Sequence, residues 1–285
     1  MQSYRHGKDD PFVRHEPCPK CGSKDALALY SSGSAQCFSA VCGHHEQSNG
    51  NVVTLQPQSR RPLEDMTSSG VVAAIPDRRL SQETCRKYNV MVEYNASGEI
   101  AKHIYPYYST DSDELKATKI RHVKTKDFHA TGDMTTNVGL FGQQTCRGGG
   151  KYITVVEGEA DALAVSEMFD GKWAVVSIRS GASGAVKDIK QNLEWLESFE
   201  NVVICFDSDN AGQEASRAVL DLFTPNKAKN VKLPVKDAGE MLKERNVQGF
   251  IREWWNAKTY QPDGIIAGLD TWESIVAQED VQSIP

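Results

Sequence analysis

The chain has 285 residues, of which 39% are hydrophobic and 25% are charged, a composition typical of a globular protein with room for one large or two smaller domains. It has no apolar run near the ~18 residues that a membrane span needs and no N-terminal signal segment, so we expect a cytosolic protein. Residues 1–150 carry 18 Lys/Arg against 16 Asp/Glu, and residues 151–285 carry 14 against 22, which gives the net charge of −6. Overall charge therefore does not indicate a nucleic-acid binder, but a local acidic site could hold metal ions.

Four of the seven cysteines form two close pairs, CxxC and CxxxxC, separated by 15 residues: Cys18, Cys21, Cys37 and Cys42. This spacing predicts a structural Zn²⁺ site with four thiolate ligands in a small β ribbon over residues 1–48. A small hydrophobic knuckle with free thiols is the alternative, although a segment of about 40 residues rarely folds without a disulfide or a metal to stabilise it. Three histidines near the pairs could each replace a thiolate: His15, His44 and His45. Residues 49–62 are polar and contain prolines, which predicts a linker.

We predict a smaller, basic subdomain over residues 63–150. Ser81 and Glu83 indicate a short capped helix over 80–88, and Gly98 marks a hairpin between two strands. Residues 114–132 then carry five cations within eleven residues: Lys116, Lys119, Arg121, Lys124 and Lys126. Their alternation predicts a strand with a cationic face for phosphates, or else an edge strand that uses lysines against aggregation. Residues 147–151 do not form a P-loop, because Thr145 and Tyr152 stand where that motif needs Gly and Ser or Thr.

Apolar strands alternate with amphipathic helices over residues 151–240. We predict strands at 152–157, 173–178, 201–206 and 230–234, with helices at 160–169, 184–199 and 213–223. Continuous apolar strands that alternate with helices are typical of a parallel sheet covered on both faces. Ligands of such sheets bind at the carboxyl ends of the strands.

Acidic residues gather at those predicted strand ends. Glu157 and Asp207 each end a strand, and Asp161, Asp209 and Asp237 follow close by. Carboxylates that share one edge repel one another unless a divalent cation such as Mg²⁺ lies between them, so the group predicts a metal site. Singly, Asp161 and Asp209 could equally stabilise helix N-termini, and Glu159 is expected to be only a turn residue.

The motifs EGEAD at 157–161 and DSD at 207–209 resemble the Toprim domain of primases, topoisomerases and some nucleases. Together with the cysteine ribbon, the chain resembles the primase half of T7-type phage primase-helicases over nearly its whole length. The resemblance implies an α/β fold with a Toprim-type parallel sheet and flanking helices, preceded by the zinc ribbon. It divides the chain after the linker into an N-terminal subdomain at 63–150, a catalytic subdomain at 151–255 and a linker toward a helicase at 256–285.

The same resemblance implies a DNA primase, a nucleotidyltransferase that makes short RNA primers on single-stranded DNA from NTPs. The implied catalytic acids are Glu157, Asp161, Asp207, Asp209 and Asp237. Glu157, Asp207 and Asp209 would hold Mg²⁺ or Mn²⁺, while Lys119, Arg121 and Lys126 would bind nucleotide and template. The implied partners are a helicase, in cis or in trans, and a DNA polymerase that receives the primer. No membrane partner is expected, and a phage protein of this kind would act in the host cytosol.

Three features depart from the family pattern. The second cysteine pair is CxxxxC, where close relatives have CxxC. Ser32 and Ser34 stand where relatives place an Asp and a His that read template bases, so we expect a different recognised trinucleotide. No ATPase follows residue 285, so a helicase in trans or a truncated chain is expected. Two other functions use the same residues: a Toprim nuclease or topoisomerase that cleaves DNA, and a non-catalytic zinc module that binds single-stranded DNA.

Overall fold

The computed structural model describes residues 12–24, 26–38, 42, 44–46 and 70–261. Contacts between residues divide the chain into two units, Met1–Arg60 and Arg61–Pro285. The predicted linker, 49–62, lies outside the described residues. Among the helices that are described, none is long and apolar enough to cross a membrane.

The first unit is a small antiparallel sheet in the order β1-β2-β3-β4. Its strands are Phe12–Glu16, Leu27–Tyr30, Ala35–Cys37 and His45–Glu46. The buried cluster of this unit consists of three cysteines and two small aliphatic residues: Cys18, Cys37, Cys42, Leu27 and Ala35. So few apolar side chains cannot hold the ribbon together by hydrophobic burial alone.

The second unit begins with an antiparallel sheet in the order β5-β6-β7-β8. Its strands are Met91–Tyr94, Ile100–Tyr108, Leu115–His122 and Phe128–Gly132. The predicted hairpin is confirmed, because β5 and β6 pair on either side of Gly98. The predicted helix is also confirmed: α1 spans Gln82–Lys87, and the Ser81 side chain accepts a hydrogen bond from the Thr84 N–H. Two short 3-10 helices, η2 at Pro76–Arg78 and η3 at Gln143–Thr145, flank this sheet in sequence.

The cationic segment forms β7, which pairs with β6 on one side and β8 on the other. It is therefore an interior strand, and the alternative of an aggregation-blocking edge strand is wrong. Residues 117, 119 and 121 share one face of β7 because side chains alternate along a strand. Lys119 and Arg121 therefore lie on the same face, and Lys116 on the other.

The second sheet of this unit has the order β10-β9-β11-β12-β13. Its strands are Ala174–Ser177, Tyr152–Val156, Asn201–Cys205, Ala228–Asn230 and Lys258–Thr259. The first four in this order are parallel, and β13 is antiparallel to β12. The parallel sheet predicted from the apolar runs is therefore confirmed.

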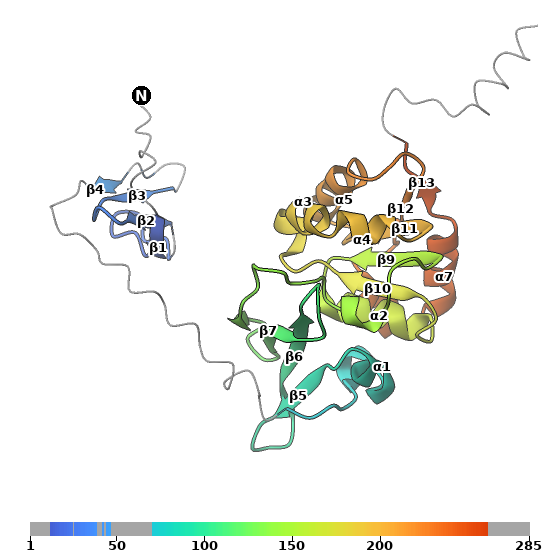
Figure 1. Ribbon diagram of the computed structural model, residues 1–285. Coiled ribbons are helices and arrows are strands. Elements are labelled where there is room, and N and C mark those ends of the chain that lie inside the picture. The colour runs from blue at the N-terminus through green and yellow to red at the C-terminus, as the bar shows by residue number, and fades with distance from the viewer. Residues whose placement is uncertain (1–11, 25, 39–41, 43, 47–69, 262–285) are drawn as a thin grey trace, which may run out of the picture. The chain divides into compact units, whose positions relative to one another are not determined.

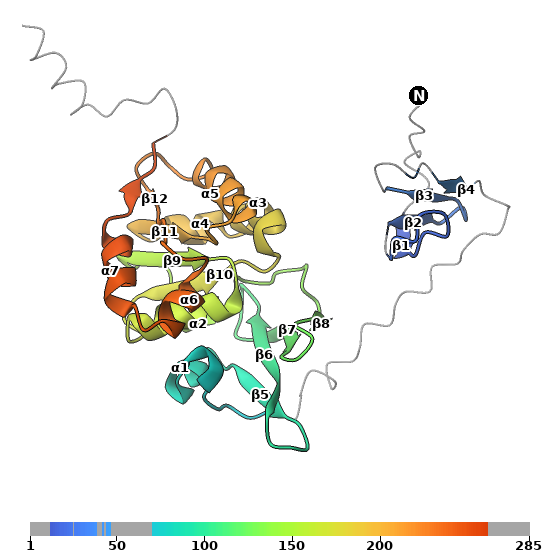
Figure 2. The same ribbon diagram turned by 180° about the vertical axis from the view of Figure 1, so that it is seen from behind.

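Helices cover both faces of this sheet (Figure 1). The helices α3, α4 and α5, which span Gly181–Gln191, Leu193–Glu197 and Asn210–Leu220, pack on one face. The helices α2, α6 and α7, which span Glu159–Met168, Ala238–Lys243 and Val247–Trp255, lie on the other, as Figure 2 shows from behind. The core on this second face continues into the first subdomain, where Tyr88, Tyr105, Tyr107 and Phe141 are fully buried.

Three predicted elements differ from the observed ones. The helix expected over 184–199 is two helices, separated at Asn192, whose side-chain amide donates to the Asp188 carbonyl. The last parallel strand occupies Ala228–Asn230 and not 230–234. The C-terminal linker predicted from residue 256 begins too early, because Lys258–Thr259 pairs with β12 as part of the sheet. Residues 262–285 lie outside the described part of the chain.

Candidate active site

The acidic residues lie at the carboxyl edge of the parallel sheet. Glu157 follows β9 directly, and Asp207 lies two residues beyond the end of β11. Since β9 and β11 are adjacent and parallel, with Val156 opposite Cys205, these two carboxylates are brought to the same edge. The sequence predicted this placement from the apolar runs that precede each acid.

Glu157 is held by a backbone donor from a third segment. Its Oε1 accepts a hydrogen bond of 3.1 Å from the Ala182 N–H, near the start of α3. Its Oε2 is buried and has no hydrogen-bond partner among the described residues. A buried carboxylate oxygen without a partner is costly unless a cation or water satisfies it, so this atom fits a metal ligand.

Asp209 is the N-cap of α5, where its Oδ1 accepts from the Gly212 N–H at 2.9 Å. The helix-start role considered for Asp209 is therefore real, and it fixes the side chain beside Asp207. Gly212 is required here, because a Cβ at that position would lie 2.3 Å from the Asp207 carbonyl oxygen. The start of α5 thus packs directly against the backbone that carries Asp207.

A second loop brings Asp237 to the same edge. The Ser208 N–H donates to the Lys236 carbonyl at 2.7 Å, and the Ser208 hydroxyl donates to the Val235 carbonyl at 2.8 Å. These bonds join the loop after β11 to the loop before α6. Asp237 is the N-cap of α6 and accepts from the Glu240 N–H at 2.7 Å. Asp161, in the first turn of α2, accepts from the Gly239 N–H at 2.9 Å and so ties α2 to α6.

Burial and neighbouring negative charges raise the pKa of two of the acids. Burial, together with the charges of Glu157 and Asp237, raises the pKa of Asp207 to about 6. Burial and the charge of Asp237 raise the pKa of Asp161 to about 7, although the Gly239 N–H opposes that shift. Groups that share excess negative charge in this way attract a divalent cation. Lys236, which no sequence pattern singled out, has its Nζ 3.6 Å from Asp207 Oδ2 and offsets part of this charge.

Glu159 is not the turn residue that the sequence analysis expected. It is 4% exposed and accepts hydrogen bonds from the Tyr107 hydroxyl at 2.5 Å and from Lys119 Nζ at 2.7 Å. Lys119 Nζ also donates to the Arg179 carbonyl at 3.0 Å. The cation predicted to bind nucleotide is thus anchored between the two sheets of the second unit.

The other predicted cations lie along the β7–β8 hairpin. Arg121 is half-buried, with its guanidinium 6.0 Å from the centre of the Phe128 ring, and Lys119 Nζ is 5.1 Å from the same centre. Lys126 is exposed in the turn, with a positive φ of 64°. No sequence pattern singled out Arg78, whose positive charge adds to the burial that lowers the pKa of Arg121 and opposes the burial that raises the pKa of Asp161.

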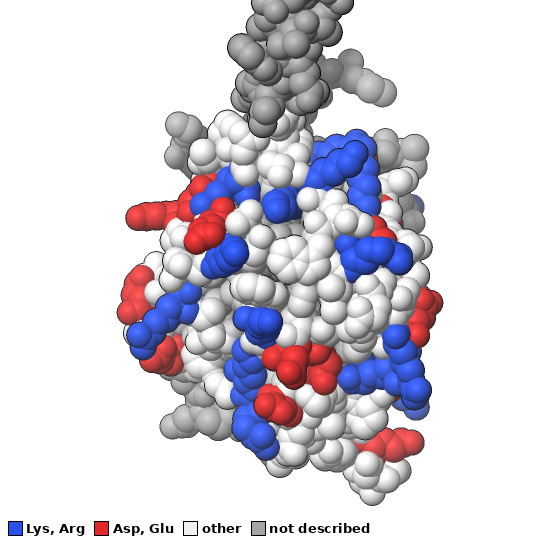
Figure 3. Space-filling model, turned by 90° about the vertical axis from the view of Figure 1, so that its right-hand side faces the viewer, with Lys and Arg blue, Asp and Glu red and all other residues white. Residues whose placement is uncertain are grey.

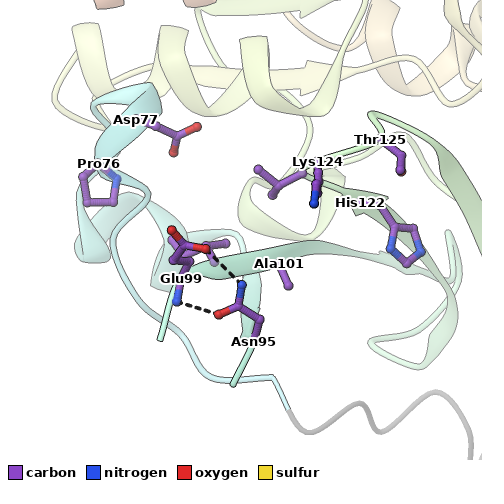
Figure 4. Close-up of a pocket in the computed structure, with 10 residues that line it drawn as sticks. Pro76, Asp77, Asn95, Glu99, Ala101, His122, Lys124 and Thr125 are labelled. Carbon is purple, nitrogen blue, oxygen red and sulfur yellow. Dashed lines mark hydrogen bonds between the residues drawn. The ribbon is translucent and has the colours of Figure 1, made fainter. Parts of the chain in front are cut away.

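Beside this hairpin, a pocket of about 730 Å³ opens between η2, the β5–β6 turn and the end of β7 (Figure 4). Charges of both signs line it, from Asp77, Glu99 and Lys124, together with His122. The Asn95 and Glu99 side chains bond to each other at 3.1 Å. The five acids of the sheet edge are absent from its lining, so the pocket does not extend the candidate active site.

In the first unit, the sulfurs of the four cysteines form a compact cluster. Sγ of Cys18 lies 3.7 Å from that of Cys42, and Sγ of Cys21 lies 3.8 Å from that of Cys37. All four sulfurs lie within 4.8 Å of one another. Four thiolates about 2.3 Å from a zinc ion would be spaced by about 3.8 Å, which the Cys18–Cys42 and Cys21–Cys37 distances match. The wider CxxxxC spacing does not displace Cys42.

The carboxylates at the sheet edge do not form so compact a set. Among the described residues, only one group of three or more His, Cys, Asp or Glu side chains has all its ligand atoms within 4.8 Å of one another. That group is the four cysteines. Looser spacing suits Mg²⁺, which uses one or two carboxylates and keeps waters for substrate phosphates. The unpartnered Glu157 Oε2 and the raised pKa of Asp207 both fit such an ion.

The two serines considered for template recognition lie between β2 and β3. The Ser32 hydroxyl donates to the Ser34 hydroxyl at 3.0 Å, and the Ser34 N–H donates to Ser32 Oγ at 3.2 Å. Ser34 is only 7% exposed. Its burial argues against a direct contact with a base, whereas Ser32 remains half-buried.

The fold and the acids at the strand ends define a Toprim protein. A family model described as Toprim-like matches residues 154–242, the segment that carries all five acids.

Relatives of known function show which kind of Toprim protein the chain resembles. The DNA helicase/primase of Enterobacteria phage T3 is 33% identical over 273 residues, which is 92% of this chain and 46% of that protein. The crystal structure of the primase fragment of bacteriophage T7 primase-helicase matches with a TM-score of 0.63 and 31% identity, over 86% of this chain and 100% of that fragment.

A third relative is a primase domain in a larger assembly. The structure of bacteriophage T7 lagging-strand DNA polymerase interacting with primase domains of two gp4 subunits, bound to an RNA/DNA hybrid and dTTP, matches with a TM-score of 0.62 and 32% identity. It covers 70% of this chain and 97% of that one. The chain therefore belongs to the family of T7-type phage primase-helicases and corresponds to their primase part. It spans about half of the phage T3 relative, 46% of its length.

Proposed function

We propose that this chain is a DNA primase that synthesises short RNA primers on single-stranded DNA from NTPs. The observation that carries the proposal is the carboxyl edge of the Toprim sheet. There, Glu157 Oε2 has no partner among the described residues, and the pKa of Asp207 is raised beside further acids. The family supports the same assignment, since the matching T7 fragment is a primase.

In this proposal, Glu157, Asp207 and Asp209 hold one or two Mg²⁺ or Mn²⁺ ions, with Asp161 and Asp237 as neighbouring acids. Bound there, the ions would stabilise the attacking 3′-hydroxyl oxygen and the leaving oxygen of the NTP α-phosphate. The hydrogen bonds from Ala182 and Gly212 orient two of the three ligands before substrate arrives. Such preorganisation places the charge where the reaction needs it.

Lys119, Arg121 and Lys126 would neutralise the triphosphate and the template backbone. Lys119 is positioned for this by Glu159 and the Arg179 carbonyl, which hold its ammonium toward the Toprim sheet. Arg78 would add to the same positive field, because its charge acts on both Asp161 and Arg121.

The zinc ribbon would help to select the template trinucleotide and to pass the primer to a DNA polymerase. A helicase, in cis or in trans, would supply unwound template, and the protein would act in the cytosol of the infected host. Two features support these partners: the T3 relative is a fused helicase/primase, and a matching T7 structure contains primase domains with a polymerase.

The test is primer synthesis with single-stranded DNA, labelled NTPs and Mg²⁺ or Mn²⁺, with products resolved by length. We expect short oligoribonucleotides, and we expect Asp207→Asn to lower their yield by at least about 100-fold, because a ligand carboxylate is lost. Asp170→Asn is the matched control, since Asp170 is exposed with a left-handed φ of 54° that Asn tolerates. Normal synthesis by Asp207→Asn would contradict the metal-site assignment. DNA cleavage without NTPs would indicate a nuclease, and DNA binding without incorporation would indicate a non-catalytic module.

A further inference from the structure

At the opposite edge of the parallel sheet, aromatic side chains gather where the strands begin. The Tyr152 ring, at the start of β9, lies 5.3 Å from that of Trp173, 5.1 Å from that of Trp254 and 5.5 Å from that of Trp255, as measured between centroids. Trp254 is buried, and its indole N–H donates to Thr154 Oγ1 at 2.9 Å. Trp255 is 52% exposed. The core therefore uses the first indole, and the second is presented to solvent.

Two lysines lie near the Tyr152 ring of this aromatic cluster, and two more are exposed at the last two strands of the sheet. Lys151 Nζ lies 5.9 Å and Lys229 Nζ 5.7 Å from the centre of the Tyr152 ring. Lys232, two residues beyond the end of β12, and Lys258, in β13, are exposed. In the described part of the chain, none of these four ammonium groups has a carboxylate oxygen within 4.0 Å. Figure 3 views the molecule from this side and shows a central area without charge, bordered by Lys and Arg side chains and by several Asp and Glu side chains.

A pocket of about 570 Å³ lies beside β12 and β13. Side-chain amides, two of the lysines and one carboxylate are among the groups that line it: Asn230, Asn256, Gln261, Lys232, Lys258 and Glu253. The Asn230 Oδ1 is buried and has no hydrogen-bond partner among the described residues. Amide side chains can donate to and accept from the edges of nucleobases.

We propose that a second surface of the chain binds single-stranded nucleic acid outside the catalytic site. This surface, named here the Trp255 surface, consists of two aromatic residues and four lysines: Tyr152, Trp255, Lys151, Lys229, Lys232 and Lys258. An exposed indole offers a stacking platform for an unpaired base, and lysines without carboxylate partners offer charge for its flanking phosphates. Double-stranded DNA fits less well, because its bases are already stacked. An acidic protein would use the lysines but would leave the indole and the pocket amides without a specific role.

The proposal goes beyond primer synthesis. Tyr152 and Lys151 lie at the amino end of β9, whereas Lys232 lies just beyond the carboxyl end of β12. The catalytic acids follow the carboxyl ends of the neighbouring strands β9 and β11, so one strand of template or primer could contact both the Trp255 surface and the acids. The surface would retain the nucleic acid while the catalytic edge exchanges nucleotides.

The test is binding of a fluorescein-labelled oligothymidylate of about 15 nucleotides, followed by anisotropy without NTPs or Mg²⁺. We expect Trp255→Ala to weaken binding at least about fivefold, the effect of one lost stacking contact. Lys229→Glu with Lys258→Glu should lower the slope of log K against log salt by about 1.4, since each lysine–phosphate contact on a single strand accounts for about 0.7. Trp255→Phe keeps an aromatic ring and should restore part of the affinity, which separates stacking from a folding defect.

The matched control is Lys187→Glu with Lys190→Glu, which makes the same charge change at two exposed positions of α3. It should leave affinity and salt slope within about twofold of the parent. Irradiation of an oligonucleotide that contains 5-bromodeoxyuridine should cross-link the peptide with Trp255, and mass spectrometry identifies it.

Unchanged affinity in both the Trp255→Ala and the paired lysine variants, with no cross-link at Trp255, would overturn the proposal and would favour a protein partner. Asp207→Asn should bind the oligonucleotide as the parent does. The Trp255 surface variants should still make primers on short templates. The test thus distinguishes failure of this proposal from failure of the proposed primase activity.

Discussion

At the scale of single residues, Asp161 couples stability to pH. Its pKa is about 7 in the folded chain, against about 3.9 for an unfolded aspartate. The folded state therefore binds the proton more tightly, and stability falls as pH rises from about 4 to about 7. Asp161→Asn stays neutral and keeps an acceptor for the Gly239 N–H. In buffer without divalent cations, we expect the variant to be more stable than the parent by about 4 kcal/mol at pH 8 and equal to it near pH 4.

Thermal unfolding at a series of pH values measures this difference. Asp133 is a control of opposite sign, because hydrogen bonds from Thr135 lower its pKa to about 2. Asp133→Asn should destabilise the chain at neutral pH, and its effect should vanish as the pH falls toward 2. If the unfolding free energies of the parent and of Asp161→Asn ran parallel from pH 4 to pH 8, this would contradict the raised pKa of Asp161.

The ion pair between Lys119 and Glu159 should stabilise the fold more than a less buried pair of similar geometry does. Glu159→Ala leaves the Tyr107 hydroxyl and the Lys119 ammonium without their acceptor, so we expect a loss of about 3 kcal/mol in urea denaturation. Glu93 and Lys102 are the comparison, since they pair at 2.8 Å with side chains 29% and 30% exposed. Glu93→Ala should cost less than about 1 kcal/mol. Equal losses would mean that burial does not strengthen the Lys119 pair.

Glu159 also shows why some site residues could not be predicted. Asp207 and Glu157 follow apolar strands, so the sequence predicts their place at a sheet edge. The partners of Glu159 are Tyr107 and Lys119, which lie 52 and 40 residues away in sequence. No local pattern records such a pairing, because it arises only when the two sheets pack together.

At the scale of elements, the start of α5 depends on Gly212. A methyl group there would lie 2.3 Å from the Asp207 carbonyl oxygen, a backbone atom that cannot move aside cheaply. We expect Gly212→Ala to displace the Asp207 loop, to cost about 1–3 kcal/mol of stability and to reduce primer synthesis. Ala211→Gly, at the neighbouring exposed position, is the control and should lose about 1 kcal/mol with activity retained. A fully active and stable Gly212→Ala variant would contradict the close packing.

Elements were predicted best where one pattern dominates. The buried strands β9, β10 and β11 and the capped helix α1 are near their expected positions, since continuous apolar runs and a Ser cap are strong local signals. The break between α3 and α4 was missed, because it depends on the Asn192 side chain and not on a Gly or Pro. The strand β13 was missed as well, because a strand of two residues exists only through its pairing with β12.

At the scale of the whole molecule, two units with separate cores should respond differently to loss of metal. The buried cluster of the first unit consists largely of its cysteines, whereas the second has two large clusters around the parallel sheet. A ribbon of this size cannot fold through its apolar side chains alone, so a metal held by the four sulfurs should supply most of its folding free energy.

We therefore expect a zinc chelator, or Cys37→Ser, to unfold the ribbon and to leave the thermal transition of the second unit within about 2 °C of its original value. Limited proteolysis should then remove the first unit and spare a fragment from about residue 61. Cys85→Ser is the matched control, since Cys85 is buried in the core of the second unit and should instead lower that unit's transition. If chelation lowered the stability of both units equally, the two would share one folding transition, and the metal would stabilise the catalytic sheet as well as the ribbon.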